Sequence, residues 1–196
     1  MRRRALLTGL AALPLAACGG APGVVSTGGG AAAIAEAAQL AELSAMIAAL
    51  GPDVDREEAA RVARIALTEP RQWAIDWGMT DPPLIHNMKV NAGLRPRGLC
   101  REWADDLEAR MRREGVQTLG WHRAIANHDS LLIEHSTLIV SARGDAMAQG
   151  IVLDPWRLGM GRLFYARVTE DPKYDWTPRQ QVFAFKRARD ARRSGR

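Results

Sequence analysis

Residues 100–115, CREWADDLEARMRREG, and residues 119–126, LGWHRAIA, decide the fold class because the residue pattern changes between them. In the first stretch, apolar side chains recur at the spacing of one face of an α-helix. This predicted stripe consists of Cys100, Trp103, Ala104, Leu107 and Met111. The second stretch is short and has the composition of a strand. The sequence therefore predicts a helix that begins at Cys100, ends at Gly115 and is followed by strands.

The chain after residue 118 has the pattern of an antiparallel sheet, because turn-forming residues separate short apolar runs. The predicted strands are residues 119–126, 131–141, 150–153 and 162–168. A run of helices followed by a run of strands is typical of the α+β class. We therefore expect a helical N-terminal half with a Cys100-headed helix packed on an antiparallel sheet.

Two helices are predicted in the first seventy residues. Residues 34–50 are strong helix formers, and Gly51 followed by a proline is expected to end the helix. Asp55 and Glu58 have the spacing of a capping box, and the helix that they start is expected to end at Pro70. The residues between there and Cys100 lack a clear period, which predicts a short helix and then a long irregular approach.

The N-terminus has the pattern of an export signal. Three arginines at residues 2–4 precede an apolar run that ends in LAAC at Cys18. This ending resembles the lipobox of bacterial lipoproteins, which implies that residues 1–17 are removed and that Cys18 is diacylated. Gly19 after it fits sorting to the outer membrane, facing the periplasm. The alternative is an uncleaved N-terminal helix, and a partial twin-arginine pattern leaves the export route open.

Charge is concentrated at the two ends of the chain. The net charge is +5, of which residues 1–17 carry +3 and residues 186–196 carry +5, so the remaining body carries −3. A nucleic-acid groove would need basic residues gathered on a folded face. The sequence therefore gives no support for a nucleic-acid partner.

The predicted organisation is one domain with a leader and a tail. Residues 18–33 are small and nearly uncharged, which predicts a flexible tether. Residues 34–185 form the single expected domain. Residues 186–196 form a basic tail that is expected to fray or to lie on an acidic surface such as lipid headgroups, or else to be solvated without a role.

Cys100 is the residue with the clearest chemical potential. Lipidation of Cys18 would leave Cys100 as the only thiol, so no internal disulfide could form. A sulfur at the start of a helix lies near free backbone N–H groups, which favours the thiolate. The alternative interpretation is a small, inert core residue on the apolar stripe.

The strand register suggests a partner for this thiol. If the hairpin closes symmetrically about Gly144 and Asp145, His135 lies directly opposite Asp154. Directly opposed residues share a face, with Cβ atoms roughly 5 Å apart, so the carboxylate could orient the imidazole. The alternatives are that His135 only bonds within the sheet and that Asp154 only forms a turn before a proline.

Three runs carry a family resemblance: GLCREWADDLEARM (98–111), EHSTLIVSA (134–142) and GIVLDPWR (150–157). Together they resemble the three blocks of the transglutaminase-like cysteine-enzyme superfamily. The resemblance implies a papain-like core with Cys100 as nucleophile, His135 as general base and acid, and Asp154 as the residue that orients His135. It also implies that Trp103 is the aromatic residue one turn into the helix.

The remaining polar candidates are weaker. Beyond the Cys100 backbone N–H, an oxyanion donor is not assigned, and Asn87 and Asn91 are the weak candidates. His86, His122 and His128 are fallbacks for the base. Scattered histidines and one free thiol lack metal-ligand spacing, and the glycines at 28–30 follow no strand, so no metal and no cofactor is expected.

The leading hypothesis is a lipid-anchored cysteine enzyme that acts on amide or peptide bonds through an acyl-enzyme. Protease, amidase and transglutaminase remain open, with a peptide or protein substrate as partner, and so does a cell-wall hydrolase with the related papain-like Cys–His chemistry. The alternative is a catalytically inactive lipoprotein that uses the same fold to bind a protein or a cell-wall partner. Its candidate surface residues are Trp73, Trp77, Trp121, Trp156 and Trp176.

Overall fold

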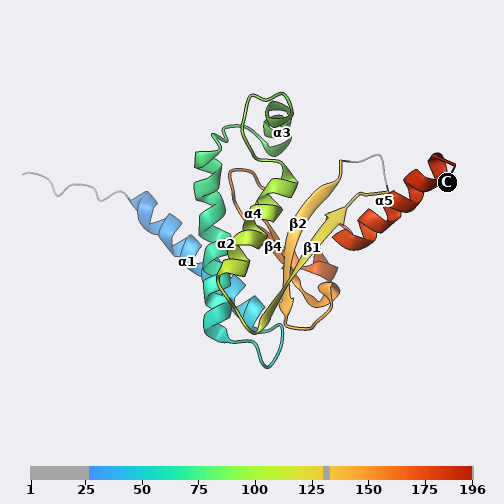
Figure 1. The fold of residues 1–196 in the computed structure, drawn as a ribbon. Helices are drawn as coiled ribbons and strands as arrows, with labels where there is room; N and C mark the ends of the chain where they lie inside the picture. The colour runs from blue at the N-terminus through green and yellow to red at the C-terminus, as the bar shows by residue number, and fades with distance from the viewer. Residues whose placement is uncertain (1–26, 130–132, 196) are drawn as a thin grey trace, which may run out of the picture.

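The computed structural model describes residues 27–129 and 133–195, and these ranges form helices packed on a five-stranded antiparallel sheet (Figure 1). The helices are α1 (Thr27–Ala48), α2 (Arg56–Asp76), α3 (Pro83–Asn91), α4 (Cys100–Arg113) and α5 (Arg179–Arg193). The strands are β1 (Leu119–Ala126), β2 (His135–Ala142), β3 (Ile151–Asp154), β4 (Phe164–Arg167) and β5 (Thr177–Pro178), in the order β4-β3-β2-β1-β5. The predicted α+β class is confirmed.

Helix α1 begins earlier than the sequence pattern predicts. Residues 27–33 are helical, although the pattern assigns them to a flexible tether. The alanine-rich run that follows has high helix propensity and carries the helix back over the glycines at 28–30, which are therefore not a linker. Residues 30–39 are exposed and Leu40 is half-buried. Leu43 is the first buried side chain among the described residues of this helix.

Helix α1 also has a composition found in membrane segments. Its window Gly30–Ala48 is long enough to span a bilayer and has a mean hydropathy of 1.3, with 11% of the window buried. Core helices and export signals have the same properties, so length and composition alone do not decide its environment. The predicted signal, residues 1–17, and Cys18 lie outside the described residues.

Helix α2 begins as predicted but continues past Pro70. Oδ1 of Asp55 accepts the backbone N–H groups of Glu57 and Glu58, both at 2.8 Å, and so caps the helix. The predicted end at Pro70 is wrong. A proline inside a helix costs about 3 kcal/mol, and burial of Pro70 and of Ala74 one turn later offsets that cost.

Glu58 ties α2 to the sheet instead of completing a capping box. Its carboxylate accepts the backbone N–H groups of Gln117 (2.7 Å) and Thr118 (2.8 Å), just before β1. Burial raises the pKa of Glu58, but these bonds and the Thr118 hydroxyl outweigh it and hold the pKa below its usual value. The start of α2 therefore fixes where the sheet begins.

Helices α3 and α4 enclose the segment that leads to Cys100. The segment 71–99 is more helical than predicted, because α2 occupies its start and α3 its middle. Pro83 at the first turn of α3 has a backbone angle that favours helix initiation. Helix α4 has the predicted start, and Trp103, Leu107 and Met111 are fully buried on its apolar stripe.

The predicted strands are present in the expected order along the chain, and β5 is a strand that the sequence pattern does not indicate. The register between β2 and β3 differs by two residues from the expected one. Ile139 pairs with Val152, so His135 is not directly opposite Asp154 and that pairing is wrong. The chain between β2 and β3 contains a 3₁₀ turn, Met147–Gln149, which moves the centre of the connection by one residue. Because side chains alternate with a period of two, Asp154 stays on the face that carries His135.

Both faces of the sheet are covered. One face places Leu138, Val140 and Leu153 against the helical layer of α1, α2 and α4 (Figure 1). The other face carries Ile139 and Val152, which pack against a smaller apolar cluster. Because both faces are buried, β2 and β3 have nearly continuous apolar runs, and apolar and polar residues do not alternate clearly along them.

The C-terminal segment is a helix. Residues 186–193, expected as a frayed or surface-bound tail, belong to α5. Val182 is the buried residue of this helix, and Lys186 forms an ion pair with Glu134 at 2.6 Å. The rest of α5 projects away from the sheet (Figure 1), so its helicity comes from its own propensity and not from packing.

Candidate active site

The loop before Cys100 is held from two sides. The Glu102 carboxylate accepts the backbone N–H groups of Gly98 (2.8 Å) and Leu99 (3.0 Å). On the other side the imidazole of His86 donates to the Arg97 carbonyl at 2.8 Å. A Cβ atom on Gly98 would lie 2.4 Å from that imidazole, and Gly98 has φ +132°, so only glycine fits here. The start of α4 is thereby fixed.

Cys100 lies where α4 meets the sheet. Its side chain is half-buried and unbridged, and its thiol donates to the Glu134 carbonyl with the sulfur at 3.8 Å from the oxygen. Glu134 directly precedes His135 in the chain. Cys100 also packs against the aromatic cluster that contains Trp103 and Trp156. Cys100 is therefore enclosed on the side of this cluster and half-buried as a whole.

His135 and Asp154 form a buried ion pair. Nε2 of His135 donates to Oδ2 of Asp154 at 2.6 Å, and their side chains are 2% and 1% exposed. Burial alone would lower the pKa of His135, but the charge and hydrogen bond of Asp154, with a smaller contribution from Cys100, raise it to about 9. Nδ1 of His135 is buried and has no hydrogen-bond partner among the described residues.

Asp154 is held on every side. Oδ1 accepts the backbone N–H groups of Trp156 and Arg157, both at 3.1 Å, and Oδ2 also accepts from Nε of Arg157 at 2.9 Å. Burial raises the pKa of Asp154, but the neighbouring cations outweigh it and the pKa is lowered. Asp154 therefore forms the turn after β3 and also binds His135, so the turn-forming role and the contact with His135 occur together.

A second carboxylate, which the sequence pattern does not indicate, fixes Arg157. Its guanidinium donates to both oxygens of Asp171, at 2.9 and 2.7 Å, and Nε1 of Trp176 donates to the same carboxylate at 2.9 Å. The side chains of Arg157 and Asp171 are 7% and 0% exposed. Asp171 lies fourteen residues beyond Arg157 in an irregular loop, so no helical or strand spacing in the sequence links the two residues.

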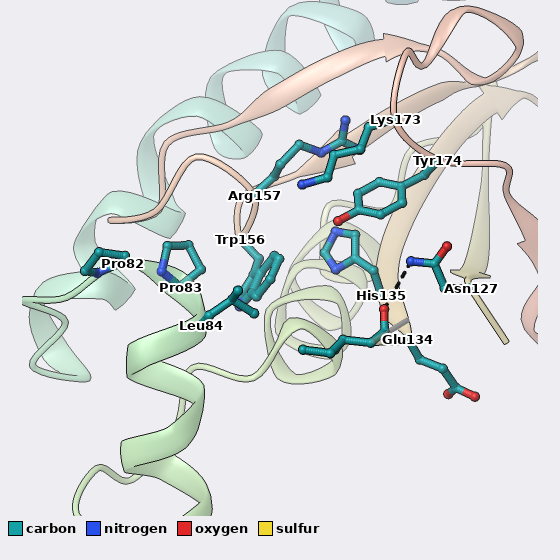
Figure 2. Close-up of a pocket in the computed structure, with 11 residues that line it drawn as sticks. Pro82, Pro83, Leu84, Asn127, Glu134, His135, Trp156, Arg157, Lys173 and Tyr174 are labelled. Atoms are coloured by element: carbon teal, nitrogen blue, oxygen red, sulfur yellow. Dashed lines mark hydrogen bonds between the residues drawn. The ribbon is translucent and has the colours of Figure 1, made fainter. Parts of the chain in front are cut away.

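Aromatic rings enclose the imidazole. The ring centroids of Trp156 and Tyr174 lie 4.7 and 4.8 Å from that of His135, and Trp176 lies at 5.6 Å. Figure 2 shows His135 between Trp156 and Tyr174. The rings exclude water from the imidazole, and this burial by itself lowers the pKa of His135, so the raised pKa depends on Asp154.

A pocket of about 570 Å³ opens beside His135. Figure 2 shows Pro82, Pro83 and Leu84 on one side of it and His135 with Tyr174 on the other. Its lining residues are Pro82, Pro83, Leu84, Asn127, Ile133, Glu134, His135, Trp156, Arg157, Lys173 and Tyr174. A cavity of this size with mostly apolar walls and a few polar groups has the properties of a ligand site.

The other candidate residues are distributed unevenly. Asn87 reaches the site, because its Oδ1 accepts from Nε1 of Trp156 at 3.1 Å. Asn91 is exposed at the end of α3. His122, in the middle of β1, shares a hydrogen bond with Ser141 near the end of β2, and His128 packs against Phe185 of α5. His86 supports the Cys100 loop as described above.

The tryptophans proposed as a binding surface are largely packed. Trp73 and Trp77 stack on each other and contact Trp103. Trp156 and Trp176 surround His135, and Trp121 packs against the main core. The set therefore does not form one exposed face.

In comparisons with known proteins, no family model, no curated protein and no solved structure matches the chain. Among the described residues, no three His, Cys, Asp or Glu side chains come together in a group that could hold a metal ion. The functional interpretation rests on the residues and geometry of the site.

Proposed function

We propose that the protein is a transglutaminase-like cysteine enzyme that cleaves an amide or peptide bond, or transfers its acyl group, by way of Cys100, His135 and Asp154. One observation carries the proposal: a buried His135–Asp154 pair lies beside the half-buried thiol of Cys100 at the start of a helix, close enough for Cys100 to help raise the pKa of His135. A nucleophile, its base and the group that orients the base are the requirements of this chemistry.

The proposed reaction has two steps. The Cys100 thiol gives its proton to Nδ1 of His135, and the thiolate attacks the substrate carbonyl to form a C–S bond. The imidazolium returns that proton to the leaving nitrogen, which departs as an amine and leaves a thioester. Water or a second amine then attacks the thioester carbonyl while His135 takes its proton. The C–S bond breaks, the acid or the new amide is released, and His135 returns the proton to the sulfur to restore the thiol.

The surroundings of the site supply orientation and charge. Asp154 fixes the His135 ring so that Nε2 carries a proton and Nδ1 is free to exchange one with the thiol. The backbone N–H of Cys100, at the free N-terminus of α4, is a donor for the developing oxyanion. Asn87 is the better of the two candidate side-chain donors, because it contacts Trp156 beside His135.

We also propose that the protein is a lipoprotein anchored through Cys18 at the outer membrane and facing the periplasm. The sequence around Cys18 supports this proposal. Anchoring would leave Cys100 as the single thiol of the mature chain.

The test of the proposed activity is the alkylation rate of Cys100 by iodoacetamide as a function of pH, in the chain carrying Cys18→Ala. An ordinary thiol has a pKa near 8.5 and reacts slowly at about pH 6. A thiolate held by protonated His135 should react there at least tenfold faster than in the His135→Ala variant. The matched control, His122→Ala, removes a histidine of the same sheet that is distant from Cys100.

Two results would overturn the proposal. One is a wild-type profile that coincides with that of an ordinary thiol and with that of His135→Ala. The other is alkylation only after unfolding. Either result would favour the inactive binding lipoprotein.

A further inference from the structure

The pocket beside His135 has apolar walls contributed by four separate segments. They are the start of α3, the residues before β2, the turn after β3 and the loop that carries Tyr174. Pro83, Trp156 and Tyr174 supply rigid apolar surface, and Leu84 is 50% exposed at the rim. Such walls favour an apolar side chain of the ligand, because burial there removes both surfaces from water.

Further exposed apolar residues lie on the segments that adjoin the pocket. Ile85 and Met88 of α3 are 45% and 67% exposed, and Leu158 and Met160 in the following loop are 43% and 42% exposed. That loop lies against α3, because a Cβ atom on Gly159 would be 3.3 Å from Pro83. Exposed apolar residues gathered around a pocket indicate a ligand that extends past it, as a polypeptide segment does.

Lys173 is the cation of the pocket that lacks a counter-charge. Arg157 is neutralised by Asp154 and Asp171, and Glu134 is neutralised by Lys186. Within the described residues Lys173 has no ion pair, and its ammonium lies 5.1 Å from the centre of the Tyr174 ring. The pocket therefore complements an anionic group beside its apolar walls.

We infer that the pocket binds a polypeptide segment in which an apolar side chain lies against Trp156 and Tyr174 and a carboxylate pairs with Lys173. The inference deepens the proposed function, on which it rests, by naming the substrate class of the same site. A polar, sugar-linked peptide would leave the apolar walls against polar groups and is the competing substrate class.

The first test compares four thiol reagents that differ in one property at a time. They are chloroacetyl-phenylalanine, chloroacetyl-phenylalaninamide, chloroacetyl-glycine and chloroacetyl-glycinamide. In each case the Cys100 thiolate displaces chloride and forms a C–S bond, so the rate reports how the reagent is positioned. In the Cys18→Ala chain we expect the phenylalanine reagents to react at least fivefold faster than their glycine counterparts, and each acid to react faster than its amide.

Two variants assign the preferences to residues. Lys173→Gln should lower the acid-to-amide rate ratio about two- to fivefold, the range of one exposed ion pair. Leu84→Ser should lower the phenylalanine-to-glycine ratio instead. Arg192→Gln removes an exposed cation near the end of α5 and should leave both ratios unchanged.

A second measurement separates this inference from the proposed activity. In the chain carrying Cys18→Ala and Cys100→Ala, N-acetyl-phenylalanine should shift the indole N–H resonance of Trp156 at lower concentration than its amide does. If Cys100 proves unreactive but this binding occurs, the pocket assignment stands and the proposed activity fails. Equal reaction of all four reagents together with absence of the shift, while the thiol remains reactive at acid pH, would overturn the pocket assignment alone.

Discussion

Arg157 links the pair that would carry catalysis to a second buried carboxylate. It touches no reacting atom, so its proposed role is to position Asp154 through Nε while its other nitrogens are held by Asp171. Lysine preserves the charge but cannot make this two-sided contact, because its ammonium is a compact point. Replacement of Arg157 by lysine should therefore affect the reactivity of Cys100 more than the folding of the chain.

We predict that Arg157→Lys lowers the alkylation rate of Cys100 at about pH 6 roughly tenfold, a typical effect for a group that orients a functional side chain. The measurement is the pH–rate profile with iodoacetamide, accompanied by circular dichroism to verify folding. Arg162→Lys is the matched control, since Arg162 donates to carbonyls of its own loop. An unchanged profile in a folded Arg157→Lys protein would show that Asp154 does not depend on Arg157.

The His135 pair also predicts a pH dependence of stability. Despite the opposing effect of burial, Asp154 raises the pKa of His135 from 6.5 to about 9 in the folded chain. The stabilisation is therefore complete below about pH 6.5 and is lost as the pH rises through about 9. The free energy of unfolding, relative to that of His135→Gln, should fall by on the order of 3 kcal/mol across this window.

Denaturant titrations at several pH values give this quantity. His122→Gln is an informative control, because burial lowers the pKa of His122 and its linkage therefore acts below pH 6.5 with the opposite sign. A stability difference for His135→Gln that stays constant between about pH 6.5 and 9.5 would contradict the assigned protonation.

At the scale of elements, the loop after β3 depends on a close approach to α2. Gly161 has φ +67°, and a Cβ atom there would lie 2.1 Å from the Pro70 carbonyl oxygen. Gly144, in the turn between β2 and β3, has φ +89° and open space around it. Substitution of Gly144 therefore tests backbone strain alone, whereas substitution of Gly161 tests backbone strain together with a steric clash.

We predict that Gly161→Ala lowers the free energy of unfolding by about 3 kcal/mol or more, because the loop must move away from α2. Gly144→Ala should cost about 1 kcal/mol, the strain of the left-handed conformation alone. Thermal and urea unfolding of both variants provide the comparison. Equal losses for the two would mean that the loop accommodates the added methyl group.

Elements that depend on local pattern are well predicted from the sequence. The start of α4 and the bounds of β1 match expectation because an apolar period and adjacent turn residues define them. The continuation of α2 past Pro70 differs from expectation, because it depends on burial against the rest of the fold, which the local sequence does not indicate. The sequence does not predict helix α5, because its many charged residues suggest a solvated tail, although these residues are also good helix formers.

The candidate site was accessible only in part. His135 and Asp154 share a face despite the misplaced register, because an error of two residues preserves strand parity. Their bond is therefore diagonal and not directly across. The Arg157–Asp171 fork was beyond prediction, because it depends on where an irregular loop folds back.

At the scale of the whole molecule, the lipoprotein proposal predicts a covalent modification. In a bacterial host, the full chain should incorporate an alkyne-labelled fatty acid and move to the membrane fraction. Cys18→Ser should abolish the label and Cys100→Ser should retain it, since the acyl group is expected on the first cysteine alone. A labelled Cys18→Ser chain, or an unlabelled full chain, would contradict the proposed anchor.

The helical start of α1 would change how far an anchored enzyme reaches. Leu43, the first buried side chain among the described residues of α1, lies sixteen residues after Thr27, which is about 24 Å at the rise of an α-helix. A flexible segment that could extend only as far as Thr27 is shorter than one that continues to residue 33. An anchored enzyme would therefore reach substrates over a narrower range of heights above the lipid headgroups, and proteins outside that range would escape it.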